Sequence, residues 1–486
     1  MAGLEISEAA ARRALGWVLV ATTVARLALG WVCYGFWTGD DVEILEAGFR
    51  AIGLHYVPWA LRNTLLPDLC VAPAVYVVHA LGAGSPRLLI WIASWPFVAA
   101  ATLNVYLLYR LVLAWSPRPV LALAAAFLYG WHWLPLGLGS MTFPRTVSTS
   151  CVLAAAWLAS RRPRGWWHEV LAGTAVAGAF AIRYSEGLYL PAVGLLAVAA
   201  LGAAGWRRRM LALARVAVGF AAGAALLVGV YEAATLGRAF GGLIGVVRFT
   251  FVERQTTSVT ALHPAWWYLW RLPHWWSPAA LILAAVALCR RRLAWAWLFV
   301  VIPLLVLPAI QYKELRYLQG VIPFACALSA AGALALWDAG WRRTAAALYA
   351  AAVLWQLAGI GFLTRKSMPA VAAAQALAAD PAVRTFAGVQ LWAFGERLYL
   401  GDRRTLRDIP YPATAAADLD RLAAGADAVA LYTADLSRQP PLGQSLARLG
   451  LCPWRTFAWH DAKAVSVFRP CTVGRPLGAR QAPTPR

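Results

Sequence analysis

Long apolar segments alternate with short polar connections over the first three quarters of the chain. A helix of about 20 apolar residues crosses the hydrocarbon of a bilayer, and runs of this kind recur. They predict an α-helical polytopic membrane protein with about eleven transmembrane helices. The expected spans are 14–36, 88–114, 119–139, 144–160, 167–183, 187–205, 211–233, 277–289, 294–311, 317–337 and 344–364.

Two further apolar features shape this prediction. Residues 68–84 are apolar but short and interrupted by proline, so we expect an interfacial or re-entrant hairpin that does not cross. The first span lacks a small-residue cleavage site and is expected to be retained. Charged residues are expected at the span ends.

Basic residues occupy every second connection between the spans. The clusters are Arg12-Arg13, Arg118, Arg161-Arg162-Arg164, Arg207-Arg208-Arg209, Arg290-Arg291-Arg292 and Arg342-Arg343. Such clusters face the cytoplasm in membrane proteins. We therefore expect a multi-pass plasma (inner) membrane protein with a cytoplasmic N-terminus, an external C-terminus, and external loops at 37–87 and 234–276.

Charged residues become denser after the last expected span. Residues 371–379 and 415–424 show helical patterns, and short β-like runs occur at 389–393, 428–432 and 464–468. This predicts a transmembrane domain over 1–364, an external α/β domain over 365–473, and a disordered Pro- and Arg-rich tail over 474–486. Cys452 and Cys471 lie in this polar segment, where an oxidising compartment would allow a disulfide.

Composition supports a membrane protein, with 61% hydrophobic and 14% charged residues. The net charge of +22 could suggest a nucleic-acid-binding protein. The basic residues, however, form short clusters between the spans, as expected of residues that orient a membrane protein. We expect membrane lipid as a partner and no nucleic acid. The sequence has no Walker motif, no HExxH and no tight His/Asp/Glu cluster, so we expect neither a cofactor nor a metal.

The first external loop is rich in acids. Asp40, Asp41, Glu43 and Glu46 lie within seven residues, and Glu43 and Glu46 share a helical face. They either cap and solvate an interfacial helix, with Thr38-Gly39-Asp40 resembling its N-cap, or meet a substrate at the end of the first span.

A second polar group separates two runs that are otherwise free of charge. Lys313 and Arg316 are three residues apart and share a face if a helix starts there, an arrangement that suits a phosphate. Glu314 would orient one of them. The alternative is an anchor that snorkels to lipid phosphates.

Further candidates lie on the expected external side. Arg62, Arg145 and Arg183 oppose the usual sign bias there and either bind substrate or form salt bridges with the loop acids. The 234–276 loop adds an aromatic group that is either an interfacial belt or a sugar-binding platform. Its candidate residues are Arg248, His263, Trp267 and Tyr268.

Several of these stretches resemble one family. Lys313-Glu-Leu-Arg-Tyr317, followed by an apolar run with Pro323, resembles the H-K-E-x-R-F motif of the GT-C mannosyltransferases of glycosyltransferase family 22, which include the GPI-anchor mannosyltransferases. The first luminal loop of that family is matched at Leu45-Glu46-Ala47, Pro58-Trp59, Arg62 and Leu66-Pro67. Residues 141–148, 178–191 and 263–268 match later segments in the order of the family.

The sequence also departs from the family. The family's H-P-D-E appears as Thr38-Gly-Asp-Asp41, so either Asp40 or Asp41 occupies the acidic position. Gln311 and Tyr312 stand where a histidine is usual. The C-terminal domain resembles those of bacterial membrane sugar transferases more than those of the eukaryotic enzymes.

The resemblance implies a GT-C-like bundle and an inverting glycosyltransferase. Its donor would be a polyprenyl-phosphate sugar, with mannose as the sugar, and its acceptor a hydroxyl of a glycan or glycolipid. Asp40 or Asp41 would be the catalytic base, and Lys313, Arg316, Arg183 and Arg145 would hold the donor phosphate. The expected substrate contacts are Glu43, Glu46, Arg62, Arg248, His263, Trp267, Tyr268 and Glu314.

Two other functions fit the same spans. A transporter or flippase of a lipid-linked sugar would place charges or broken helices near the middle of the membrane. A non-catalytic partner in envelope assembly would keep the fold without needing a base.

Overall fold

The structure is a computed structural model that divides into two compact units. The first comprises residues 1–31, 44–83 and 89–361, and the second comprises 32–43, 84–88 and 362–486. The residues described are 6–33, 39–53, 65–82, 85–161, 165–252, 263–289, 293–310, 313–363, 368–389, 396–400, 405–409, 415–458 and 464–471.

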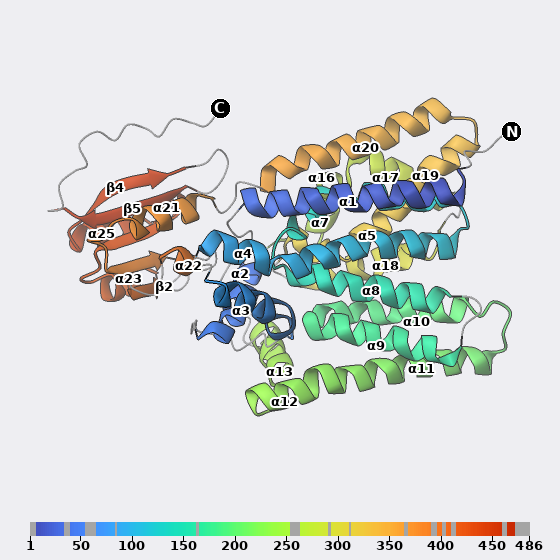
Figure 1. Ribbon diagram of the computed structural model, residues 1–486, viewed down its shortest axis with the longest axis horizontal. Helices are drawn as coiled ribbons and strands as arrows, with labels where there is room; N and C mark the ends of the chain where they lie inside the picture. The colour runs from blue at the N-terminus through green and yellow to red at the C-terminus, as the bar shows by residue number, and fades with distance from the viewer. Residues whose placement is uncertain are drawn as a thin grey trace. The chain divides into compact units, whose positions relative to one another are not determined.

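The chain up to residue 363 is helical (Figure 1). Its first part contains α1 (Glu8–Val32), α2 (Gly39–Gly48), η1 (Phe49–Ile52), η2 (Pro67–Val71), α3 (Ala72–Ala80), α4 (Pro86–Ala93), α5 (Trp95–Trp115), α6 (Pro119–Gly130), α7 (Trp133–Leu138) and α8 (Pro144–Ser160). Next come α9 (Trp166–Ile182), η3 (Tyr184–Tyr189), α10 (Leu190–Ala199), α11 (Trp206–Ala224), η4 (Ala225–Val230), α12 (Tyr231–Leu236), α13 (Gly241–Val247) and η5 (Arg248–Val252). The series ends with α15 (Trp267–Trp270), α16 (Leu272–Trp276), α17 (Pro278–Cys289), α18 (Ala296–Val306), η6 (Leu307–Ala309), η7 (Leu315–Leu318), α19 (Ile322–Asp338) and α20 (Arg342–Leu363).

Within the ranges given above, three helices are long and apolar enough to cross a bilayer: Glu8–Val32, Pro86–Trp115 and Trp206–Leu236. Five of the other expected spans correspond to shorter apolar helices, and a further short apolar helix covers 68–80, within the segment expected as a hairpin. The chain is therefore a membrane protein, while the number of crossings and the direction of its termini stay predictions.

Some expected spans are interrupted. The span expected over 119–139 divides into α6 and α7, and His132 marks the break. Its Nδ1 accepts a hydrogen bond from the Leu134 backbone at 3.3 Å, and its Nε2 lies 2.7 Å from the carbonyl oxygen of Trp275. A polar N-cap begins a new helix here, which hydropathy alone does not reveal. The loop expected over 234–276 likewise contains the short helices α13, α15 and α16.

Small residues set a close helix contact in the first unit, between α9 and α11 (Figure 1). A Cβ added to Gly173 would lie 1.9 Å from the Val216 carbonyl oxygen, and one added to Gly219 would lie 2.0 Å from that of Val170. The two backbones therefore approach as closely as small residues permit, which is typical of helix packing in membranes.

A sheet forms the core of the second unit. Among the residues described it has five strands, in the order β2-β1-β3-β5-β4. They are β1 (Thr385–Val389), β2 (Thr405–Ile409), β3 (Ala428–Tyr432), β4 (Leu451–Phe457) and β5 (Val465–Pro470). β1 runs parallel to β2 and β3, whereas β5 is antiparallel to β3 and β4.

Short helices accompany this sheet: α21 (Met368–Ala378), α22 (Glu396–Leu400), α23 (Ala415–Leu422), α24 (Thr433–Arg438) and α25 (Pro440–Arg448). Leu419, Leu442 and Leu446 pack with Val429 and Leu431 of β3 into a buried core. The segment after residue 364 therefore has the α/β character expected from its sequence. The tail 474–486 lies outside the described residues.

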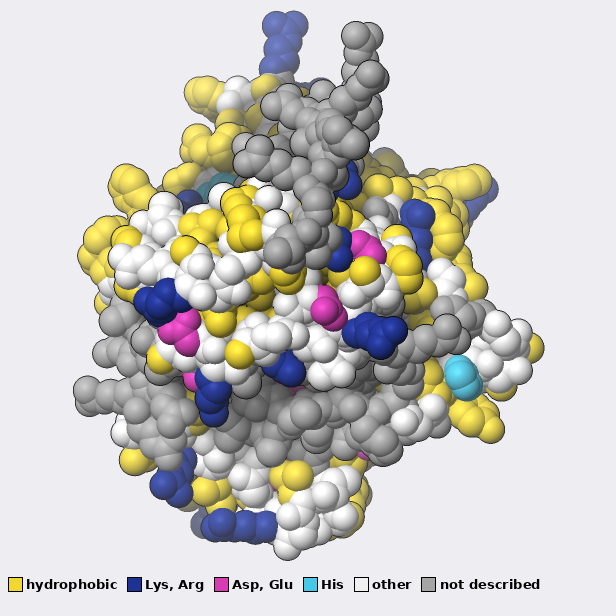
Figure 2. All heavy atoms as spheres, turned by 90° about the vertical axis from the view of Figure 1, so that its left-hand side faces the viewer, with side chains coloured by type: hydrophobic (Ala, Val, Ile, Leu, Met, Phe, Trp, Pro, Cys, Tyr) yellow, Lys and Arg dark blue, Asp and Glu magenta, His cyan; other side chains and the backbone are white. Residues whose placement is uncertain are grey.

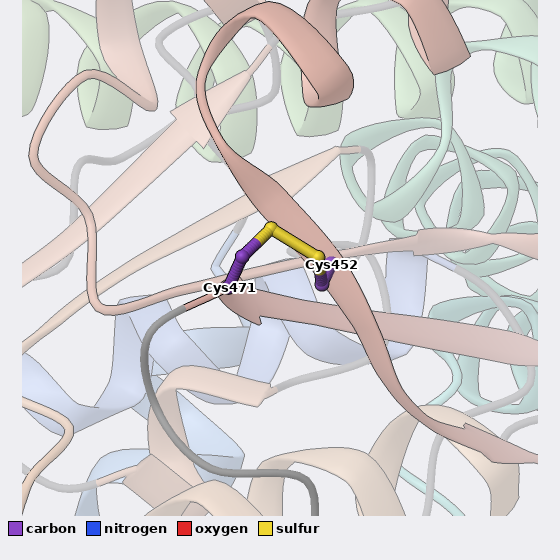
Figure 3. The surroundings of a disulfide bond; sticks show 2 residues. All are labelled: Cys452 and Cys471. Carbon is purple, nitrogen blue, oxygen red and sulfur yellow. A yellow bond between two sulfur atoms is a disulfide. The ribbon is translucent and has the colours of Figure 1, made fainter.

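Cys452 and Cys471 form a disulfide (Figure 3). Cys452 lies on β4 opposite Arg469 of β5, and the backbone N–H of Cys471 donates to the Gly450 carbonyl at 2.9 Å. The ladder brings together the two cysteines that the sequence analysis singled out. Figure 2 shows a face on which the coloured Lys and Arg side chains are spread apart.

Candidate functional site

The acids of the first loop lie on α2. Asp40 and Asp41 are in its first turn and are 4% and 0% exposed, respectively. Carboxylates near a helix N-terminus are stabilised by the backbone N–H groups and the helix dipole. Since the helix already begins at Gly39, Asp40 lies inside it and is not the N-cap.

Glu43 and Glu46 follow on the same helix and are half-buried. Val42 and Leu45 are buried beside them, so part of the surface of α2 packs against protein. Both roles given for these acids, which are to cap and solvate an interfacial helix or to meet a substrate, stay predictions. Asp40, Asp41 and Glu43 fall in the second unit and Glu46 in the first.

An ion pair between Arg145 and Glu186 forms the centre of the candidate site in the first unit. Pro144 occupies the first turn of α8 and directs Arg145 from that helix end, whereas Glu186 lies on η3. The side chains are 5% and 2% exposed. Arg145 Nη2 also donates to Ser185 Oγ at 3.0 Å. The guanidinium is thus held against η3.

Burial raises the pKa of Glu186, which lies just before the expected span 187–205. The charges of Arg145 and Arg183 oppose this rise. Arg183 is half-buried at the end of α9. The structure therefore brings together two of the arginines that were expected to hold a donor phosphate, with a carboxylate near both.

Tyr317 of η7 joins a third arginine to this group. The Arg145 Cζ lies 4.9 Å from the centroid of the Tyr317 ring, and the Arg316 Cζ lies 5.8 Å from it. Arg316 forms an ion pair with Glu314, which is the contact that an orienting role for Glu314 would need. Both guanidinium groups therefore lie near one aromatic ring, while Arg145 donates to Glu186 and Ser185 and Arg316 pairs with Glu314.

Lys313 differs from its expectation. The helix begins at Leu315, so Lys313 precedes it and does not share a helical face with Arg316. Its Nζ donates to the carbonyl oxygens of Ile310 at 2.7 Å and His263 at 2.9 Å. Burial lowers the pKa of Lys313. The residue ties the 263 segment to the turn before η7.

The aromatic segment of the 234–276 loop has two faces. His263 stacks on Trp267 with ring centroids 4.7 Å apart, and the buried Tyr268 donates to the Glu314 carbonyl at 3.5 Å. Trp266 and Trp270 are 58% and 73% exposed. The exposed pair fits an interfacial belt, and the other three residues line the Lys313–Glu314 turn.

Two of the candidate residues from the sequence, Arg62 and Arg248, are not placed in this group by the structure. Arg62 is outside the described residues, and Arg248 is an exposed residue of η5. No group of three or more potential metal ligands occurs among the residues that were described.

Several polar residues of the site were not candidates. Glu186 is one of them. Another is Gln319, whose amide donates to Thr146 Oγ1 at 3.1 Å. Asn104 Nδ2 donates to the Thr146 carbonyl at 2.9 Å. Asn104 and Gln319 could have been predicted from the sequence, because a single polar residue within an apolar helix usually faces the interior of a helix bundle.

No protein-family model matches this chain, and no curated protein matches it. Among solved structures, ArnT from Cupriavidus metallidurans in the apo state has a TM-score of 0.59 at 14% identity, covering 93% of this chain and 98% of ArnT. ArnT bound to undecaprenyl phosphate gives 0.57 at 13% identity with the same coverage. The Archaeoglobus fulgidus oligosaccharyltransferase gives 0.50 at 14% identity, covering 92% of this chain and 73% of that one. At these identities the likeness shows that the chain has a fold similar to those of ArnT and the oligosaccharyltransferase.

Proposed function

We propose that this protein is a GT-C glycosyltransferase that moves a sugar from a polyprenyl-phosphate donor to a hydroxyl of a glycan or glycolipid on the external membrane face, with inversion. The observation that carries the proposal is the cationic cluster of the first unit. Arg145, Arg183, Arg316 and Lys313 are accompanied by the carboxylates of Glu186 and Glu314. Within this group of described residues, the four cations outnumber the two carboxylates.

A phosphate ester is an anion that this group of cations would attract. The guanidinium N–H groups of Arg145 and Arg316 would stabilise the phosphate as the bond to the sugar breaks, because its charge grows in that step. A stable phosphate anion needs no acid catalyst. The similar fold of ArnT, whose structure has been solved with undecaprenyl phosphate, supports a polyprenyl carrier.

The acceptor hydroxyl needs a base, and a carboxylate of α2 would serve. Asp40 or Asp41 would take the proton as the oxygen attacks the anomeric carbon, a contribution of about two to four powers of ten in rate. Glu43, Glu46, His263, Trp267 and Tyr268 would contact the sugars. Mannose as the sugar has its support in the sequence resemblance.

The test uses purified full-length protein, a panel of radiolabelled polyprenyl-phosphate sugars, and candidate acceptors. Asp40→Asn and Asp41→Asn are compared with Asp418→Asn, whose carboxylate pairs with the exposed Arg421 on α23. One of the first two is expected to lose about 100-fold or more in rate, and the control to keep its rate. Full activity in both α2 variants would refute the proposed base.

A transporter or flippase keeps one specific observation in its favour. Charges were expected only at span ends, yet Arg26 lies in the middle of α1 and is 0% exposed. Intramembrane charges often mark substrate pathways. Purified protein in liposomes that translocates a lipid-linked sugar without acceptor, and loses this on Arg26→Met, would favour this function over transfer.

A further inference from the structure

A cavity of about 630 Å³ lies at the beginning of α1, between the last turns of α5 and α8. Its walls include Leu15, Leu113 and Ala114 together with polar groups. The Arg145–Glu186 pair lies at the other end of α8, which spans Pro144 to Ser160. At 1.5 Å per residue, the two ends are about 24 Å apart. The cavity is therefore separate from the candidate site.

The cavity carries an excess of positive charge. Arg12, Arg110 and Arg161 line it, and Glu8 is the acid in its lining. Glu8 forms an ion pair with Arg12. The charges of Arg110 and Arg161 therefore exceed the available carboxylate, in a setting partly shielded from water by apolar walls.

Aromatic rings position these two arginines. The Cζ of Arg110 lies 5.6 Å from the centroid of the Trp157 ring, and that of Arg161 lies 4.9 Å from the same ring. Arg110 Nη1 also donates to the Tyr106 hydroxyl at 2.6 Å. A guanidinium that stacks on an aromatic face keeps most of its N–H edge free for a planar or tetrahedral anion.

A buried hydroxyl also lines the cavity. Tyr109 is only 3% exposed, and its hydroxyl has no hydrogen-bond partner in the described part of the chain. Buried polar groups are nearly always hydrogen-bonded. A bound ligand with an acceptor oxygen would satisfy this group.

We infer that this cavity binds the phosphate-bearing headgroup of an anionic phospholipid. The stacked arginines would contact the phosphate oxygens, Tyr109 would donate to one of them, and the apolar walls would meet the glycerol and upper acyl chains. The headgroup would come from the leaflet opposite the candidate site, since the two lie at opposite ends of α8. The inference holds whatever reaction the protein performs.

Native mass spectrometry tests this inference. Full-length protein is reconstituted in nanodiscs of phosphatidylglycerol and phosphatidylcholine, transferred to detergent, and the lipid that remains bound is counted. Wild type is expected to retain phosphatidylglycerol in preference to phosphatidylcholine. Retention is expected to fall about tenfold in Arg110→Gln/Arg161→Gln, to fall less in Tyr109→Phe, and to rise in Glu8→Gln, which removes a competing charge.

Arg207→Gln is the matched control, because Arg207 is an exposed arginine on α11 that does not line the cavity. It should retain the lipid as wild type does. Equal retention of the two lipids, or unchanged retention in both Tyr109→Phe and the double variant, would overturn the inference. Inorganic phosphate provides the second arm. A phosphate-induced rise in melting temperature that the double variant lacks, without selective lipid retention, would assign the cavity to soluble phosphate and reject the lipid.

Discussion

Arg145 and Glu186 form an ion pair that is almost fully withdrawn from solvent, although 41 residues separate them in sequence. A buried ion pair adds little net stability, because the cost of removing both ions from water offsets much of their mutual attraction. Its partners nevertheless depend on each other, since either one alone is an uncompensated charge. The predictions for this pair follow from that dependence.

Arg145→Gln should destabilise the protein by about 3–5 kcal/mol, because it leaves Glu186 buried without its ion-pair partner. Arg145→Gln/Glu186→Gln should recover much of this loss. Thermal unfolding of the three variants in detergent measures the coupling as a double-mutant cycle. Additive losses in the double variant would show that the two residues act independently.

The stability of the single variant Arg145→Gln should depend on pH in a way that the stability of wild type does not. Arg145 is the largest charge that opposes the rise in the Glu186 pKa, so its removal raises that pKa further. A carboxyl with a raised folded-state pKa binds more protons when folded, so its contribution to stability falls as pH rises from the unfolded pKa to the folded one. The deficit of Arg145→Gln should therefore shrink as pH is lowered through that window. A deficit independent of pH would contradict this account.

Lys313 offers a pH test on the alkaline side. Burial lowers its pKa, so its charge is lost at a lower pH than that of an ordinary lysine. If this charge helps to hold the donor phosphate, the transfer rate should decline on the alkaline limb as Lys313 deprotonates. Lys313→Arg should move that limb to higher pH, because arginine stays protonated. An unchanged alkaline limb in a variant that remains active would exclude Lys313 as its cause.

The sequence predicted the presence of helices and strands better than it predicted where they begin and end. The span expected over 144–160 is α8, and the run at 428–432 is β3, because most or all residues of each are buried. Of the strand expected over 389–393, Val389 lies in β1 and the other four residues lie outside the described part of the chain. β2 and β4 were missed. β4 is an edge strand with Pro453, Trp454 and Arg455 at its centre, so its apolar alternation is weak.

The site shows a similar division. Sequence reasoning found Arg145, Arg183, Lys313 and Arg316 because charges stand out between apolar runs. It did not find the pairing of Arg145 with Glu186, since that contact depends on how η3 packs against the start of α8. The short helix η7 begins between Lys313 and Arg316, at Leu315. The residue at which so short a helix begins is likewise set by tertiary contacts.

The disulfide between Cys452 and Cys471 closes a segment with a sequence separation of 19. Closing a loop of this size limits the unfolded chain and is worth about 3 kcal/mol. Cys452→Ser/Cys471→Ser should lower the melting temperature of the sheet unit, and a reductant should have the same effect on wild type only. Reductant sensitivity that persists in the double variant would assign the effect to another group.

The disulfide also tests the expected direction of the C-terminal segment. Disulfides persist in oxidising compartments, so a membrane-impermeant thiol reagent added to intact cells after mild reduction should label Cys452 and Cys471. Labelling only after the membrane is permeabilised would reverse the expected topology. The exposed Cys289 at the end of α17, which is expected to face the cytoplasm, serves as the opposite control.

Replacing Arg26 should stabilise the protein, whereas replacing Arg145 should destabilise it. It is fully buried in α1, and its three side-chain nitrogens have no hydrogen-bond partner in the part of the chain that was described. An unpaired buried ion costs several kcal/mol, so Arg26→Met should raise the melting temperature. Arg215→Met is the matched control, because Arg215 pairs with the buried Glu169 at 3.1 Å, and its loss should lower the melting temperature.

The two variants together separate structural cost from function. A chain that keeps a destabilising charge in a span, when methionine would pack without that cost, points to a use for the charge. Arg26→Met that is more stable but inactive, in transfer or in translocation, would assign Arg26 to the substrate path. Arg26→Met that is less stable than wild type would instead show that the guanidinium has partners, such as bound water, that offset its burial.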